Sequence, residues 1–488
     1  MTTYTYTNPI IKGFNPDPSI CRVGDDFYLA TSTFEFSPGL PVYHSKNLID
    51  WELVSHGLSR PEQMTLSRKI PSAFGLYAPT IREINGRFYM VCTNVADDNF
   101  AQGNFLIWTD DIRGEWSDPI WLDTPGIDPS LFVDDDGTVY YSGTHKDIYV
   151  RQLNLETGEL GERLKVWDGT GAADPEAPHI YKKDGYYYLL IAEGGTSYGH
   201  MISMARSKNL TGPYENCPNN PVMTNRSSNL PIQAAGHADL VQDADGKWWA
   251  VCLGVRPISY PLRHLLGRET HLMAVDWSGD WPVFATDGHL PLEATVDLPG
   301  PPPKGSADPI VDWVSAFEWD DRLIEKTTDG FSLMPNDKKI SDQEPMALIL
   351  QRQQTFDFKA HATLDLIDLS DGEAGITVYL NPSHHYELAV NKGQAGNGLL
   401  FRRQIGSLWK VEKEVAYDAE QLRVMVSGDK DKYEFFYLDA SDEWVKIGEG
   451  ETKYVTTEVG GVFTGVFFGF YASSTLDKQV VRIQDISF

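Results

Sequence analysis

The chain has 488 residues, with 41 lysines and arginines against 69 aspartates and glutamates, and its formal net charge is −28. Nucleic acids and anionic membrane surfaces are bound through clusters of basic side chains, so this charge argues against both as partners. The four cysteines are scattered and form no CxxC pair, which indicates neither a zinc site nor a disulfide framework and predicts buried free thiols.

The N-terminal segment predicts a cytoplasmic protein. The first residues, MTTYTYTNPIIKGF, contain no basic region followed by an apolar run and therefore do not resemble a signal peptide. No apolar stretch approaches the roughly 20 residues that a membrane span requires. We therefore expect a soluble cytoplasmic protein without a membrane partner.

A carboxylate between two prolines stands near the start of the chain, in the segment NPDPS at 15–19. Proline restricts both its own backbone and that of the residue before it, so Asp17 is held stiffly on both sides. By itself the segment would be an ordinary surface turn, because Asp and Pro are common turn residues. The rest of the chain favours a different interpretation.

Five related segments follow one another in the first part of the chain. Each opens with a small or polar residue, continues with a hydrophobic pair and a glycine-containing turn, and ends in an aromatic strand. Their first residues are Asp17, Ala78, Asp128, Ala177 and His237. Repeats of about 40–50 residues, each made of a few strands, are typical of β-propeller blades. The sequence therefore predicts an all-β fold with a five-bladed β-propeller over residues 1–298; a chance resemblance among hairpins is the alternative.

A proline-rich segment, PGPPPKG at 299–305, changes the composition and predicts a stiff linker over residues 299–312. Beyond it the chain alternates polar and apolar residues with period two, as in AGITVYL at 374–380 and HYELAVNK at 385–392. Seven or more short strands of this kind predict a β-sandwich over residues 313–488. By itself this domain could bind sugar or serve a structural purpose.

The propeller prediction brings distant acidic residues together. Equivalent positions of successive blades surround the central channel, so Asp17, Asp128 and His237 are expected to converge there. Glu176 stands immediately before the fourth repeat and should join them. Like charges at one place repel and raise one another's pKa values, and such clusters are typical of functional sites.

Three converging carboxylates match the hydrolysis of a glycosidic bond, which needs a general acid and a second carboxylate as base or nucleophile. The third charge would help to keep the acid protonated near neutral pH. An aromatic content of 12% also suits the stacking of neutral sugars, although all-β cores are rich in aromatic residues as well. A Ca²⁺ site is the competing interpretation. The run Asp134–Gly137 has no EF-hand pattern and is expected to be an exposed turn between strands.

Five motifs in order are similar to glycoside hydrolase family 43, and in particular to its β-xylosidase branch. They are NPDPS at 15–19, GIDPSLF at 126–132, PEAPHIY at 175–181, AEGGT at 192–196 and GRET at 267–270. The resemblance runs through nearly the whole chain and implies a five-bladed β-propeller followed by a concanavalin-like β-sandwich. It also implies inverting hydrolysis of β-1,4-xylosides and α-L-arabinofuranosides.

The resemblance assigns a role to each acidic residue. Asp17 is similar to the general base that activates water, Glu176 to the general acid, and Asp128 to the residue that raises the pKa of the acid and orients it. Arg268 resembles an arginine that hydrogen-bonds sugar hydroxyls; without the family pattern, an ion pair with Glu269 would be the simpler interpretation.

Further site residues also follow from the resemblance. Phe34 resembles an aromatic residue that lines the sugar pocket, and Tyr77 stands where many xylosidases of this branch carry Trp. His237 aligns with a channel histidine near a central water or divalent cation; a satisfied core histidine is the other interpretation. Phe463, from the segment 460–473, is either an aromatic residue that closes the pocket or part of a core strand.

The sequence analysis therefore predicts an exo-acting β-xylosidase that releases xylose from the non-reducing end of xylo-oligosaccharides and leaves open activity on α-L-arabinofuranosides. The alternative is mainly an α-L-arabinofuranosidase, for which Tyr77 is the motivation. A sugar-binding propeller without catalysis would be expected to lack one carboxylate. The retaining fructosidases also have five blades and three acids but a different nucleophile motif. No cofactor is expected to be required, a structural Ca²⁺ in the channel is left open, and the resemblance implies a homodimer or homotetramer.

Overall fold

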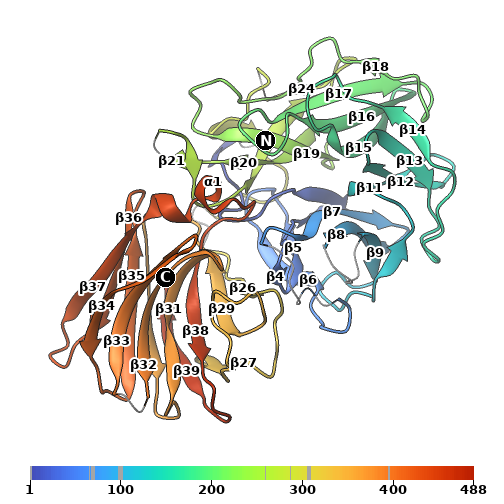
Figure 1. The fold of residues 1–488 in the computed structure, drawn as a ribbon. Coiled ribbons are helices and arrows are strands. Elements are labelled where there is room, and N and C mark those ends of the chain that lie inside the picture. Colours follow the sequence, from blue (N-terminus) through green and yellow to red (C-terminus); the bar gives the residue numbers. More distant parts are fainter. Residues whose placement is uncertain are drawn as a thin grey trace.

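The computed structural model describes residues 3–64, 66, 72–96, 103–258, 260–285, 287–304, 309–393 and 396–488. Within them the chain forms two β domains side by side, a propeller in blue to yellow-green and a sandwich in yellow to red (Figure 1). No helix in this described part of the chain is long and apolar enough to cross a membrane.

The propeller consists of five four-stranded antiparallel sheets in chain order. The first contains β2 (Ser19–Val23), β3 (Asp26–Ala30), β5 (Gly39–Ser45) and β6 (Glu52–Leu58). The second contains β7 (Gly75–Ile84), β8 (Arg87–Val95), β9 (Gly103–Thr109) and β10 (Ile120–Leu122). The third contains β11 (Ile127–Val133), β12 (Val139–Thr144), β13 (Ile148–Gln152) and β14 (Leu164–Trp167). The fourth contains β15 (Glu176–Lys183), β16 (Tyr186–Glu193), β17 (Met201–Ser207) and β18 (Glu215–Asn216). The fifth contains β19 (Gln233–Gln242), β20 (Trp248–Val255), β23 (Glu269–Asp276) and β24 (Val283–Phe284).

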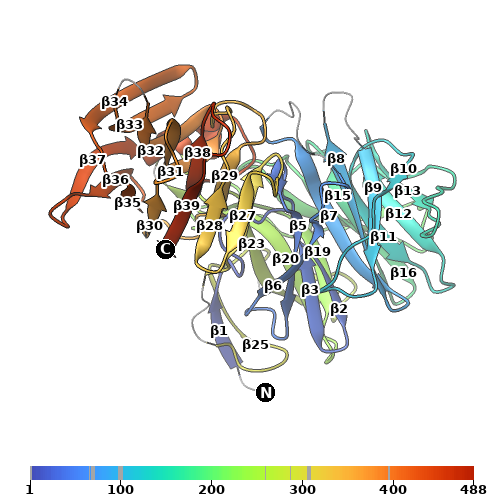
Figure 2. The same cartoon turned by 90° about the horizontal axis from the view of Figure 1, so that it is seen from below.

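Each blade therefore corresponds to one repeat, and the predicted five-bladed propeller is confirmed. The run Asp134–Gly137 forms the turn between β11 and β12, as expected. Two short ribbons stand outside the blades. They are β1 (Thr3–Thr7) with β25 (Glu293–Asp297), seen below the blades in Figure 2, and β21 (Pro257–Ile258) with β22 (Arg263–His264).

The first residue of every repeat has the same unusual backbone. Asp17, Ala78, Asp128, Ala177 and His237 all lie in the left-handed region, with φ between 38° and 55°. In the last four blades the register of the strand pairing shifts at this point. Such bulges re-aim side chains, and a non-glycine residue held there costs about 1–3 kcal/mol. The repeat therefore turns its first side chain away from the regular strand direction.

A buried carboxylate, Asp239 on β19, ties the blades together in the channel. Its Oδ2 accepts hydrogen bonds from Ser19 Oγ (2.7 Å) and from Arg82 Nη1 (2.7 Å). Its Oδ1 accepts hydrogen bonds from Arg82 Nη2 (2.9 Å) and Tyr181 Oη (2.7 Å). Burial would raise the pKa of Asp239, but the Arg82 guanidinium holds it well below its usual range. One carboxylate therefore joins blades one, two, four and five.

The third blade enters this network through His179. Ser130 on β11 and His179 on β15 are linked through Ser130 Oγ and His179 Nδ1, 2.9 Å apart, and Arg82 Nη2 lies 3.1 Å from the same nitrogen. All five blades are thus connected through polar groups at the axis, where hydrophobic packing alone could not set the angle between sheets.

The sandwich packs an eight-stranded sheet on a seven-stranded sheet. The larger sheet runs β34 (Leu408–Ala416), β33 (Gly398–Ile405), β32 (His384–Lys392), β31 (Gly372–Asn381), β38 (Phe467–Ser473), β29 (Ala347–Arg352), β26 (Trp313–Ala316) and β4 (Phe36–Ser37). The smaller sheet runs β27 (Ile324–Thr327), β28 (Gly330–Leu333), β39 (Val481–Ser487), β30 (Phe358–Asp365), β35 (Gln421–Gly428), β36 (Lys432–Leu438) and β37 (Trp444–Glu451). Two single turns, η1 (Thr452–Val455) and α1 (Thr457–Gly460), follow β37.

The two domains share a sheet. Strand β4 comes from the first blade and pairs with β26 of the sandwich, so that Phe36 lies opposite Ala316 and Ser37 opposite Ser315. The backbone of the propeller therefore extends a sheet of the second domain, and the joint is more rigid than side-chain contact alone would make it.

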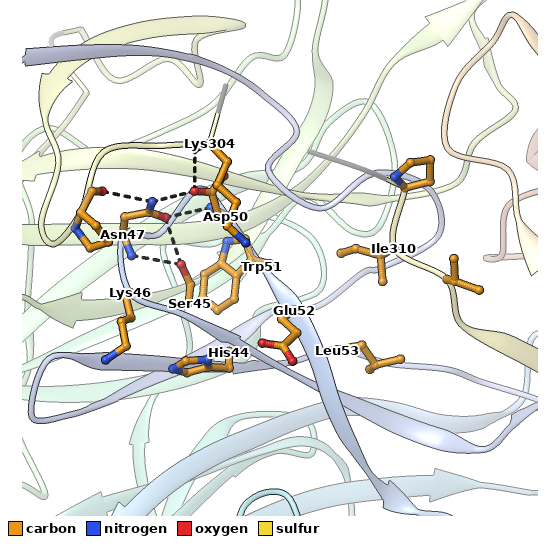
Figure 3. A pocket seen from close by; sticks show the side chains of 13 residues that line it. His44, Ser45, Lys46, Asn47, Asp50, Trp51, Glu52, Leu53, Lys304 and Ile310 are labelled. Carbon is orange, nitrogen blue, oxygen red and sulfur yellow. Dashed lines mark hydrogen bonds between the residues drawn. The ribbon is translucent and has the colours of Figure 1, made fainter. Parts of the chain in front are cut away.

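The predicted linker, 299–312, lies against the first blade, although its residues 305–308 fall outside the described residues. A cavity of about 520 Å³ opens between them (Figure 3). Its polar groups bind one another: Asp50 Oδ2 accepts hydrogen bonds from Asn47 Nδ2 (2.9 Å) and from the Lys304 amide (3.0 Å). We interpret this cavity as the space left between the linker and blade one, where the two pack against each other.

The Asp239 network leads to a stability prediction. Replacing Arg82 with Met removes the cation and leaves the Asp239 carboxylate buried without its charge partner. We expect the free energy of unfolding to fall by about 3–5 kcal/mol, as is typical when one member of a buried ion pair is lost. The shift of the urea unfolding midpoint, followed by tryptophan fluorescence, measures it.

Arg87→Met is the matched control, because Arg87 pairs with Asp110 at the surface of the second blade. Surface ion pairs contribute little, so a much smaller shift is expected. Equal shifts in the two variants would contradict the role of the channel network.

Candidate active site

One cavity of about 230 Å³ contains every site residue that the sequence analysis singled out. These are Asp17, Phe34, Tyr77, Asp128, Glu176, His237, Arg268 and Phe463. All five blades and the sandwich contribute to it, from positions far apart in the sequence. The convergence that the repeat predicted is therefore present in the fold.

Asp17 is buried and surrounded by donors. Its Oδ1 accepts a hydrogen bond from Arg268 Nη1 (2.9 Å) and lies 3.6 Å from His237 Nδ1, while its Oδ2 accepts one from Ser32 Oγ (2.6 Å). Burial alone would raise the pKa of Asp17, but Arg268, His237 and the hydrogen bond from Ser32 together lower it below its usual value. At neutral pH this group is a carboxylate.

The other two acids are shifted the opposite way. Burial, opposed by His237 and reinforced by Asp17, raises the pKa of Asp128 to about 6. Burial and the negative neighbours Asp128, Asp17 and Asp174 raise the pKa of Glu176 to about 9. At neutral pH Glu176 therefore holds a proton while Asp17 does not. The cavity contains an acid and a base made from the same functional group.

The guanidinium of Arg268 has two donor nitrogens that no described residue accepts from. It is buried and donates through Nη1 to Asp17, whereas Nε and Nη2 find no acceptor among the described residues. The alternative ion pair with Glu269 is wrong, because the Glu269 carboxylate binds the guanidinium of Arg256 instead (2.7 Å). Donors without acceptors in a buried site are available to a polar ligand or to ordered water.

Three aromatic residues form the apolar wall. The centre of the Phe34 ring lies 4.6 Å from the centre of the Tyr77 ring and 6.2 Å from the centre of the Phe463 ring. Arg268 stands over Phe34 and Phe463, with Cζ 5.3 Å and 5.8 Å from the ring centres. The core-strand interpretation of Phe463 is wrong: the residue lies between α1 and β38 and is 42% exposed. It belongs to the cavity because its loop reaches over the propeller.

Two loops, 264–268 of the propeller and 457–466 of the sandwich, close the site against each other. The Val466 amide donates to the Leu265 carbonyl (3.0 Å). A Cβ on Gly465 would lie 2.4 Å from the Leu266 carbonyl oxygen and 2.7 Å from Gly267 N, so the two backbones touch where only glycine fits. One loop carries Arg268 and the other carries the aromatic wall residue Phe463.

A carboxylate of the sandwich binds residues on two sides of the rim of the cavity. Glu458 on α1 accepts hydrogen bonds from Tyr198 Oη (2.9 Å) and from the His264 amide (2.9 Å), and its Oε1 lies 2.7 Å from His264 Nδ1. Tyr198 follows Gly195 and Thr196, which line the cavity. The second domain thus holds both sides of the cavity mouth.

Sequence reasoning missed four lining residues. They are Ile127, Asp174, Gly195 and Thr196. Asp174 could have been found, because it stands two residues before Glu176, directly before the motif at 175–181, and adds a negative charge beside the acid. Gly195 and Thr196 were part of the AEGGT motif, but nothing in the sequence says that this loop bends toward the acids.

The cavity combines an ionised carboxylate, a protonated carboxyl group, unpaired donors and aromatic walls. Residues 6–282 match the family model "Glycosyl hydrolases family 43", and residues 320–482 match "Beta xylosidase C-terminal Concanavalin A-like domain". The chain belongs to glycoside hydrolase family 43. It is a glycoside hydrolase, and its concanavalin-like second domain is the one that the resemblance implied.

Relatives of known name agree with this membership. The chain is 39% identical to a Bacteroides ovatus protein named non-reducing end alpha-L-arabinofuranosidase, over 96% of this chain and 91% of that protein. It is also 39% identical to a xylosidase/arabinosidase of Butyrivibrio fibrisolvens, over 96% and 95% of the two chains. The crystal structure of a xylan beta-1,4-xylosidase from Bacillus halodurans superimposes with a TM-score of 0.89 at 30% identity, over 98% of this chain and 100% of that one.

The glycine contact between the domains leads to a second prediction. Gly465→Ala inserts a methyl group against the 266–267 backbone and pushes the two loops apart, which moves Phe463 and Arg268. We expect kcat/KM to fall by about 10- to 100-fold, since a displacement of about 1 Å in a site can cost that much. Initial rates on a glycoside that the wild-type enzyme hydrolyses measure the effect.

Gly279→Ala is the control, because a Cβ there meets nothing closer than 4.0 Å. It should leave the rate unchanged. An active Gly465→Ala enzyme with unaltered KM would show that the loop contact does not shape the cavity.

Proposed function

We propose that the chain is an exo-acting β-xylosidase that releases xylose from the non-reducing end of β-1,4-xylo-oligosaccharides with inversion. The observation that carries the proposal is the opposite protonation of Asp17 and Glu176 within one cavity. Glycosidic bond hydrolysis by inversion needs such a pair, a base for water and an acid for the leaving oxygen.

In this proposal Asp17 removes a proton from the attacking water. Its charge is maintained by Arg268 and by the hydrogen bond from Ser32, so it is available as a base at neutral pH. Glu176 donates its proton to the glycosidic oxygen as the bond breaks. Asp128 acts on Glu176 through its charge, and its own position is supported by the hydrogen bond from the Ala177 amide (3.2 Å).

The size and closure of the cavity support exo action. About 230 Å³ is below the 300–1,000 Å³ typical of sites for drug-sized ligands, which favours a single sugar ring. The polar network of Asp239, Arg82 and His179 fills the channel between the inner strands. Only the end of a chain enters such a site, and Arg268 would bind the hydroxyls of the terminal sugar through Nε and Nη2.

An α-L-arabinofuranosidase is the second candidate. The relative named for that activity shares 39% identity, and the sugar pocket carries Tyr77, at a position where the family resemblance implies Trp in many xylosidases. The two pentoses present similar hydroxyls, so a pocket built of Arg268 and aromatic walls could accept either.

We propose that the reaction requires no metal. The described residues contain no cluster of three potential His, Cys, Asp or Glu ligands, and the carboxylate of Asp239 is already neutralised by Arg82. A structural Ca²⁺ beside His237 stays a prediction, which metal analysis of the purified protein would test. Cytoplasmic location and a homodimer or homotetramer stay predictions, which cell fractionation and sedimentation would test.

The substrate class is tested with wild-type enzyme and Asp17→Asn on 4-nitrophenyl β-D-xylopyranoside and α-L-arabinofuranoside. We expect higher kcat/KM on the xyloside and a loss of about 10²–10⁴-fold in the variant, the usual contribution of a catalytic base. Proton NMR of the first-formed sugar should show inversion. Asp136→Asn, at an exposed position of the turn in the third blade, is the control.

A higher kcat/KM on the arabinofuranoside would support the second candidate instead. An active, folded Asp17→Asn enzyme would remove this residue from the mechanism.

The acid is tested through pH and leaving group. The wild-type rate should fall as the pH rises through about 9, because Glu176 then loses its proton. Glu176→Gln should lose this alkaline limb and should lose most activity on xylobiose, whose leaving group needs a proton, and least on an activated aryl xyloside. Steady-state pH profiles on both substrates measure it.

Asp174→Asn provides the control for the electrostatic argument. It removes one negative neighbour of Glu176, so the alkaline limb should move to lower pH while the acid itself remains. Equal losses on both leaving groups in Glu176→Gln would count against its role as the acid.

A further inference from the structure

A carboxyl group outside the three acids is completely buried behind the aromatic wall. Glu35 follows Phe34 in the sequence and has no exposed surface. Its hydrogen bonds to the described residues come from backbone amides, and among those residues no lysine, arginine or histidine contributes to its electrostatic balance. Burying an ionisable group without a charge partner is costly, and such groups cluster where they serve function.

The contacts of Glu35 lead to the sugar pocket. Its Oε2 accepts a hydrogen bond from the amide of Ala73 (3.1 Å), and the carbonyl of the same residue accepts one from Tyr77 Oη (2.5 Å). Ala73 has φ of 68°, a left-handed conformation that a non-glycine residue adopts at a cost. One peptide segment is thus held from both sides, by Glu35 and by the hydroxyl of the cavity residue.

The loop that carries Glu35 is itself fixed. Phe34 exchanges two backbone hydrogen bonds with Leu76 at the start of β7 (3.0 Å and 3.1 Å). The Glu35 carbonyl accepts a hydrogen bond from the amide of Phe317 in the sandwich (2.6 Å). The side chain of Glu35 therefore projects from an anchored backbone, and it can hold the amide of Ala73 in a fixed position.

We propose that Glu35 is a positioning residue, which fixes Tyr77 against Phe34 through the backbone of Ala73 and so sets the shape of the sugar pocket. The inference deepens the proposed function, on which it rests for its substrate assay. A phenylalanine at position 77 could not make this anchor, and neither could a residue without an acceptor at position 35.

The charge on Glu35 adds a measurable property. Burial raises the pKa of Glu35 to about 7. The titratable groups that feel its charge are Tyr77 on β7 and Tyr379 on β31, both phenols that stay neutral. The folded protein therefore keeps a proton that the unfolded chain loses, and stability falls as the pH rises from the ordinary carboxyl range to about 7. Glu35→Gln should not show this fall.

The experiment compares Glu35→Ala, Glu35→Gln, Tyr77→Phe and the double variant Glu35→Ala/Tyr77→Phe on the xyloside. Glu35→Ala and Tyr77→Phe should each raise KM by about 3- to 10-fold, the effect of one lost hydrogen bond, with a smaller change in kcat. The double variant should be no worse than the single ones, because both break the same chain of contacts. Glu35→Gln keeps an acceptor and should have a KM within about twofold of the wild type.

The second readout needs no substrate. The melting temperature of the wild type, relative to Glu35→Gln, should decrease between about pH 5 and pH 8. Asp243→Ala is the matched control: it removes a buried carboxylate from a turn of the fifth blade, where it accepts a hydrogen bond from Trp249 (2.9 Å). It should lower stability and leave KM unchanged. If Glu35→Ala does not fold, Glu35→Met replaces it with a side chain of similar volume and no acceptor.

Three results would overturn the inference. They are additive effects of the Glu35 and Tyr77 substitutions, an unchanged KM in folded Glu35→Ala or Glu35→Met, and a KM in Glu35→Gln as high as in Glu35→Ala. A wild-type enzyme that hydrolyses only another glycoside would contradict the proposed substrate alone, and the same variants would then be compared on that glycoside.

Discussion

The ion pair between Asp239 and Arg82 at the propeller axis is the interaction on which the site depends. Five sheets packed only through apolar faces can shift relative to one another, because hydrophobic contact is not directional. Hydrogen bonds are directional, and Asp239, with Ser19, Arg82 and Tyr181, sets the mutual angle of four blades while His179 adds the other. The acids lie at or next to the first residues of the repeats whose strands this network joins. The network therefore also fixes the distances between the acids.

The strained backbone at the start of each repeat directs side chains into the cavity between the blades. Asp17, Asp128 and His237 lie in left-handed conformations, as do Ala78 and Ala177 at the equivalent positions of the two other blades. The strain is therefore a property of the blade, and the chain places a functional side chain at some of the positions where the blade supplies it. Burial and the repulsion between the three acids raise the pKa of Glu176, at a cost in stability, while Arg268, His237 and Ser32 lower the pKa of Asp17.

The second domain completes the cavity through backbone contact. The shared strand β4, the glycine contact at Gly465 and the clamp of Glu458 join the sandwich to the loops that carry Phe34, Arg268 and Tyr198. Aromatic closure by Phe463 depends on all three. A sugar-binding module tethered by a free linker would not need such contacts, so the joint favours a structural part of the active site over an independent binding domain.

The sequence by itself determined the all-β class, the five blades and the convergence of the acids, because these follow from a repeat whose turns and alternation are local properties. It also identified eight residues of one cavity, four of them from the residue pattern and the rest through resemblance. It could not decide that Arg268 binds Asp17 while Glu269 binds Arg256, or that Phe463 leaves its strand. Nor could it show that Glu35 is buried behind Tyr77. These depend on which groups burial leaves within hydrogen-bonding distance, and only the packing of two domains decides that.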